Sequence, residues 1–93
     1  MPVFLHLGRD VAVNSEHIIM VFDMDTATWS KHTRAYLSAA EKQGKVQVIT
    51  DDIPKSAIVC REHGETVVYI SQISSKTLLK RAQEEGAWLS MGE

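Results

Sequence analysis

Basic side chains recur at helical spacing in two segments of this chain. Lys31, Arg34 and Lys42 fall on one stripe of the first segment, and Lys76 and Lys80 stand four residues apart in the second. Lysine and arginine on one face of a helix can neutralise the phosphates of a nucleic acid and release its counterions. The residues predicted to bind DNA are Lys31, Arg34, Lys55, Lys80 and Arg81.

An ordinary solvated helix surface would carry the same cations. Glu41, Glu84 and Glu85 lie among them, and mixed charges of this kind are common on exposed helix faces. The formal net charge of -2 also lacks the basic balance of a dedicated nucleic-acid binder. DNA binding therefore requires either a local basic face or the repetition of that face in an oligomer.

No complete catalytic or metal-binding constellation is present in the sequence. Asp23 and Asp25 follow an apolar run, as do the paired carboxylates of Mg²⁺-dependent haloacid-dehalogenase phosphatases, but Ala27 stands where that loop has Thr or Val. The four histidines include no helical zinc pair, and the glycines form neither a P-loop nor a dinucleotide fingerprint. We therefore predict a solvated turn at the two aspartates, no catalytic residue, no metal, no cofactor, no small-molecule substrate and no enzymatic activity.

The apolar pattern predicts the element order β-β-β-α-β-β-β-α. The close spacing of the strands favours hairpins, and hence an α+β class with a mainly antiparallel sheet and two helices packed against it. The continuous apolar run 18–22 predicts a strand covered on both faces. Strands are predicted at 3–7, 11–13, 18–22, 46–50, 56–61 and 66–71. The first helix is predicted to begin at a cap at Ser30 and to end at Gly44. The second is predicted over 76–84, with a cap at Ser74 or Ser75 and a stop at Gly86.

The length of 93 residues predicts a single domain over 1–93, with a core at about 3–85 and a short tail at 86–93. The hydrophobic fraction of 44% is that of ordinary globular proteins. Cys60 is the one cysteine and follows an apolar run, so we expect a buried strand residue and no intrachain disulfide. The longest apolar run is too short to cross a bilayer, and no signal peptide is visible, so we expect a cytoplasmic protein that does not bind membranes.

Three segments together point to one known family. They are the sequences FLHLG at 4–8, IPKS at 53–56 and VYISQISSKTLLKR at 68–81. Over about residues 3–82 the chain resembles the RemA/RemB family of bacterial extracellular matrix regulatory proteins, and it is nearer to RemB. The last segment, with its I-S-S-x-T-L-x-K-R pattern, is the most specific of the three.

The resemblance implies a transcriptional regulator of biofilm matrix genes with a LytTR-like fold. It also implies a homo-oligomer, arranged as a ring, whose repeated basic surface binds double-stranded DNA. Repetition strengthens a weak local patch, because many copies act on one polymer. The arginine pair of the family falls on Ile53 and Pro54 here, where the neighbouring Lys55 is basic, and a further arginine falls near Glu16, whereas Arg81 is retained.

The alternative is an oligomeric protein-interaction module that does not bind DNA. The negative net charge and the absence of the arginine pair favour this alternative. Trp88 and Leu89 in the tail are the predicted residues of the oligomer interface, because buried aromatic and aliphatic anchors dominate protein interfaces.

Overall fold

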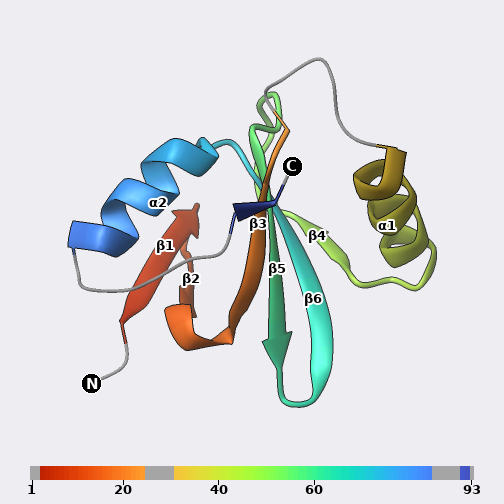
Figure 1. The fold of residues 1–93 in the computed structure, drawn as a ribbon, viewed down its shortest axis with the longest axis horizontal. Helices are drawn as coiled ribbons and strands as arrows, with labels where there is room; N and C mark the ends of the chain where they lie inside the picture. Colours follow the sequence, from red (N-terminus) through yellow and green to blue (C-terminus); the bar gives the residue numbers. More distant parts are fainter. Residues whose placement is uncertain (1–2, 25–30, 85–90, 93) are drawn as a thin grey trace.

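In the part of the chain that the structure describes, the fold consists of a central sheet of five strands and a separate two-stranded hairpin (Figure 1). The computed structural model describes residues 3–24, 31–84 and 91–92. The strand order of the central sheet is β4-β6-β5-β3-β7. Its strands are β3 (Ile18–Asp23), β4 (Val46–Val48), β5 (Ser56–Glu62), β6 (Glu65–Ser71) and β7 (Met91–Gly92). The hairpin consists of β1 (Phe4–Gly8) and β2 (Val11–Asn14), and a 3-10 turn, η1 (Ser15–His17), leads into β3.

The antiparallel pair β5 and β6 is the centre of the sheet. Its seven residue pairs run without a break from Ser56 opposite Ser71 to Glu62 opposite Glu65. The connecting residues His63 and Gly64 have φ angles of 51° and 79°. Positive φ at both positions of a two-residue loop matches the twist of the flanking strands, and glycine adopts it without steric cost.

The two faces of the sheet carry two separate hydrophobic clusters. Alternation along β5 sends Ala57 and Val59 to one face and Ile58 and Cys60 to the other. The first face packs against α1 (Lys31–Lys42) through Ala40. The second face packs against α2 (Ser75–Glu84) and the β1–β2 hairpin through residues that include Leu78, Ala82, Leu5 and Leu7. The two helices therefore lie on opposite sides of the sheet (Figure 1).

Local signals set the ends of both helices. Gly44 has a φ of 72° just beyond the last turn of α1, which is the left-handed conformation that commonly terminates a helix. The hydroxyl of Ser74 accepts a hydrogen bond of 3.1 Å from the amide of Thr77, so Ser74 is the N-cap of α2. The predicted cap at Ser30 and the predicted stop at Gly86 lie outside the described residues.

The predicted α+β class and all eight helices and strands of the predicted order are confirmed, while the 3-10 turn η1 and the short final strand β7 were not predicted. Two pairings at the sheet edges were not predicted: β4 runs parallel to β6, and β7 runs parallel to β3. The prediction that both faces of the run 18–22 are covered is wrong for Ile19, which is 47% exposed. The register of β3 against β5 shifts between Ile18 and Met20, so Ile19 has no partner in the ladder.

Cys60 is fully buried, as its apolar surroundings predict. Within the described part of the chain, no helix is both long and apolar enough to cross a bilayer.

Candidate nucleic-acid interface

The loop that joins β4 to β5 holds Lys55 at one end of the central sheet. The amide of Ile49, where the loop begins, donates to the carbonyl of Ile70 at 3.0 Å, and the amide of Lys55 donates to the carbonyl of Ser71 at 2.8 Å. The carbonyl of Lys55 in turn accepts from the amide of Met24 at 2.8 Å. The backbone of Lys55 is therefore fixed between two elements while its side chain is exposed.

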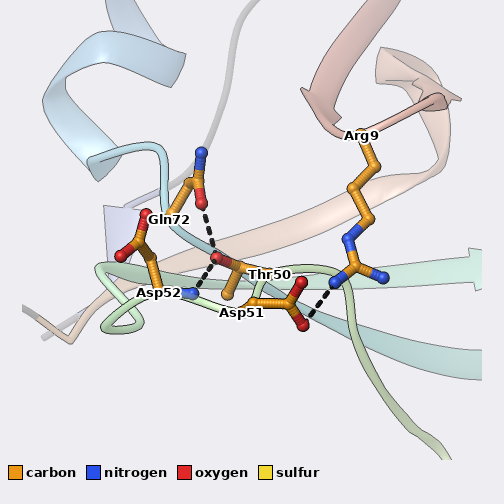
Figure 2. A network of polar contacts seen from close by, with 5 residues as sticks. All are labelled: Arg9, Thr50, Asp51, Asp52 and Gln72. Atoms are coloured by element: carbon orange, nitrogen blue, oxygen red, sulfur yellow. Dashed lines mark hydrogen bonds and ion pairs between the residues drawn. The ribbon is translucent and has the colours of Figure 1, made fainter.

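A polar network inside the loop determines its shape (Figure 2). The hydroxyl of Thr50, which is buried, donates to Gln72 Oε1 at 2.6 Å and accepts from the amide of Asp52 at 2.9 Å. A hydroxyl that accepts a hydrogen bond from the amide two residues on stabilises a tight turn. The carboxylates of Asp51 and Asp52 project into solvent beside this turn.

The β1–β2 hairpin reaches the same loop through an ion pair. Figure 2 shows the guanidinium of Arg9 extending from the hairpin turn to Asp51, with Nη2 2.6 Å from Oδ1. Arg9 has a φ of 46° and Gly8 a φ of 131°, so two consecutive residues of the turn have positive φ. The Arg9 side chain is 52% exposed and that of Asp51 95%. Ion pairs in such exposed positions typically contribute between about 0 and 1 kcal/mol to stability.

Ser71 anchors the end of β1 to the central sheet. Its buried hydroxyl donates to the carbonyl of Leu7 and accepts from the amide of Ile73 at 3.0 Å. Ser56, also buried, donates to the carbonyl of Ile73 at 2.7 Å. These bonds hold the hairpin turn, the start of α2 and the β4–β5 loop together as one rim of the molecule.

The matches to known proteins cover this rim. The family described as RemA-like, extracellular matrix regulatory protein A-like, matches residues 4–82. Extracellular matrix regulatory protein B of Bacillus subtilis (strain 168) is 33% identical over 81 residues, which are 87% of this chain and 91% of that protein. The chain belongs to the RemA-like family. The resemblance inferred from the three sequence segments is thus confirmed.

The fold of this RemA-like chain distributes the five predicted DNA-binding residues over three surfaces. Lys31 and Arg34 are exposed on α1, on one face of the sheet, and Lys80 and Arg81 are exposed on α2, on the opposite face. Lys55 lies at the end of the sheet between them. One subunit therefore does not bring all five into a single surface. The predicted interface residues Trp88 and Leu89 lie outside the described residues.

Three of the five cations of this RemA-like chain that were not in the predicted set lie near structural features described here. Arg9 is on the rim, and Lys45 and Arg61 line a polar groove of about 520 Å³ together with Glu65. The turn residues Gly8-Arg9-Asp10 mark Arg9 as exposed at a hairpin tip, and this signal was available from the sequence. Arg61 carries no local signal, because it lies inside a strand whose other residues are mostly apolar.

The buried titratable groups of this RemA-like protein are held in their neutral forms. Burial, with the nearby Glu62 carboxylate, raises the pKa of the Cys60 thiol to about 12. Burial and the same carboxylate raise the pKa of Tyr69 to about 12, and the Tyr69 hydroxyl donates to Glu62 Oε2 at 3.2 Å. Among the residues that the structure describes, no three or more His, Cys, Asp or Glu side chains are grouped to hold a metal ion.

Proposed function

We propose that this chain is a non-enzymatic, homo-oligomeric regulator of extracellular matrix genes that binds double-stranded DNA. Its membership of the RemA-like family and its similarity to extracellular matrix regulatory protein B support the regulatory role. The observation that carries DNA binding is Lys55, whose backbone is fixed on both sides and whose side chain is free to meet a phosphate. The proposed phosphate contacts come from Lys31, Arg34, Lys55, Lys80 and Arg81.

Self-association is part of this proposal because a single subunit offers too few cations on any one surface. Lys31 and Arg34 lie on the face opposite Lys80 and Arg81, and the formal charge of the chain is -2. Copies of the chain side by side would present the same small cationic surface repeatedly to one duplex, which multiplies the effect of each contact. Contacts to phosphate position a protein and carry little sequence information, so the choice of target would rest on DNA shape and bending.

The test is a titration of fluorescently labelled duplex at 50 and 200 mM salt, with the native mass measured alongside. Each phosphate contact contributes about 0.9 to the slope of log affinity against log salt, so Lys55→Gln should reduce the slope by about that amount for each subunit engaged. Lys42→Gln is the matched control, since Lys42 is an exposed lysine outside the proposed contacts. A wild-type protein that binds no duplex at either salt concentration contradicts the proposal.

A second candidate is an oligomeric protein-interaction module without DNA binding. The observation in its favour is the composition of the rim, where Asp51 and Asp52 are exposed and Ile53 is 78% exposed. An apolar side chain flanked by carboxylates suits a protein partner better than a polyanion. This candidate predicts an oligomer whose mass does not change with duplex DNA, and it predicts that truncation after Glu85, which removes Trp88 and Leu89, dissociates the oligomer.

A further inference from the structure

The guanidinium of Arg9 lies on the same rim as Lys55. Arg9 contacts Asp51 at 2.6 Å, and Asp51 precedes Lys55 by four residues in a loop whose two ends bond to adjacent residues of β6. A segment of four residues spans at most about 14 Å. The partner of Arg9 and the ammonium-bearing Lys55 are therefore close enough to meet one short stretch of a phosphate backbone.

The hairpin presents Arg9 from an anchored turn. The strand end just before it is tied down because Ser71 donates to the carbonyl of Leu7. The left-handed conformation of Arg9, with a φ of 46°, is rarely adopted by residues with a side chain, and the guanidinium extends from it across to the β4–β5 loop (Figure 2). The Arg9 side chain is nevertheless about half exposed, so other groups can approach it.

Carboxylate and phosphate are interchangeable partners for this group. A guanidinium has five donors in a planar fork, which suits the oxygens of either anion. Both side chains of the pair with Asp51 are exposed to solvent, and pairs of this kind contribute little to stability. Replacing the carboxylate with a phosphate therefore requires little free energy. While Asp51 remains in place, its own charge also repels an incoming phosphate.

We infer that Arg9 is a further phosphate-binding residue, and that Asp51 occupies its guanidinium until nucleic acid displaces it. This inference rests on the proposed DNA binding and adds a residue to that site from a different element of the fold. Asp51 thereby limits the affinity twice, by pairing with Arg9 and by adding negative charge to the rim. A chain with Asp51 neutralised should bind duplex more tightly, and the additional binding should require Arg9.

The experiment compares duplex binding by the wild-type protein, D51N, D52N, R9Q and the double variant R9Q/D51N at 50 and 200 mM salt. D52N is the matched control because it removes the same charge from the same loop, and the contact recorded for Asp52 in Figure 2 is made by its backbone amide. One additional phosphate contact corresponds to about a 3.5-fold greater loss of affinity between these salt concentrations. We expect the wild-type protein to show this greater loss relative to R9Q for each subunit engaged, because its Arg9 contacts phosphate once Asp51 is displaced. We expect D51N to bind duplex more tightly than D52N at both salt concentrations, and R9Q/D51N to gain no more over R9Q than D52N gains over the wild-type protein.

The inference is overturned if D51N and D52N gain the same affinity for duplex and the gain of D51N persists when Arg9 is also replaced. In that case the proposed function still stands, provided that the wild-type protein binds duplex. Binding by D51N at a level that R9Q/D51N cannot reach supports the inference. Absence of binding by all five proteins at both salt concentrations rejects the proposed function itself, and the inference with it. Thermal unfolding of each variant verifies that the exchanges of exposed side chains leave the fold unchanged.

Discussion

Replacing Ser71 with alanine should destabilise the whole rim of the molecule. The Ser71 hydroxyl is fully buried, donates to the carbonyl of Leu7 and accepts from the amide of Ile73. Ser71→Ala removes both bonds and leaves two backbone groups without that partner. A buried polar group that loses its hydrogen bond costs about 1 to 3 kcal/mol, so we expect the free energy of unfolding to fall by roughly 2 to 4 kcal/mol.

The assay for this prediction is urea denaturation together with thermal unfolding. In a domain of this size 1 kcal/mol corresponds to about 4–8 °C, so the midpoint should fall by roughly 10–30 °C. Ser38→Ala is the control, because Ser38 is exposed on α1 and its loss should change stability by less than about 0.5 kcal/mol. If Ser71→Ala is as stable as Ser38→Ala, the hydroxyl does not anchor β1 and the account of the rim is wrong.

Three further predictions concern the core, the turn and pH. Leu78 is one of the fully buried residues through which α2 packs on the sheet, so Leu78→Ala should lower the free energy of unfolding, measured by urea denaturation, by about 2 to 5 kcal/mol. A loss below about 1 kcal/mol would mean that α2 is not docked as described. His63→Asn should stabilise the β5–β6 turn by about 0.5 kcal/mol, because asparagine tolerates the φ of 51° better, and a lower thermal midpoint would contradict this. Folding raises the pKa of the Cys60 thiol from 9.0 to about 12. Below pH 9 the folded and unfolded chains both keep the thiol proton, so its contribution to stability is constant. Above pH 9 the unfolded chain loses this proton first, so the stability of the folded state falls as the pH rises toward 12. Denaturation measured from about pH 8 to about pH 11 should show this fall, and Cys60→Ser should make it shallower; an identical slope in the two proteins would show that the thiol does not contribute.

Local patterns were sufficient to predict most of the elements of this fold. The apolar pattern predicted strands at 56–61 and 66–71, and the short polar connection between them predicted a hairpin, because apolar patterning and turn chemistry act over a few residues. The cap at Ser74 and the stop at Gly44 followed from the same short-range rules. Burial of Cys60 followed from its apolar neighbours.

The candidate site was only partly predictable from the sequence. All five predicted residues were identified as basic residues from the sequence, and helical spacing indicated exposed stripes for those on the two helices. The family resemblance then placed Lys55 beside the arginine pair of the family and showed Arg81 as retained. The spacing carried no information about which face of the sheet each helix would cover. The tertiary structure separates Lys31 from Lys80 because α1 and α2 pack on opposite hydrophobic clusters.

The amino-acid sequence by itself determined the periods, turns, caps and family of this protein, since each of these depends on residues close together in the chain or on a motif. Only the tertiary structure decided that β4 lies parallel to β6 and that Arg9 meets Asp51. Both contacts join segments far apart in the sequence, and neither carries a local pattern. They form because burial of the two faces of the sheet brings the β1–β2 hairpin and the β4–β5 loop to the same rim. Which residues meet there depends on how the whole chain packs, and the spacing of side chains along the sequence does not determine it.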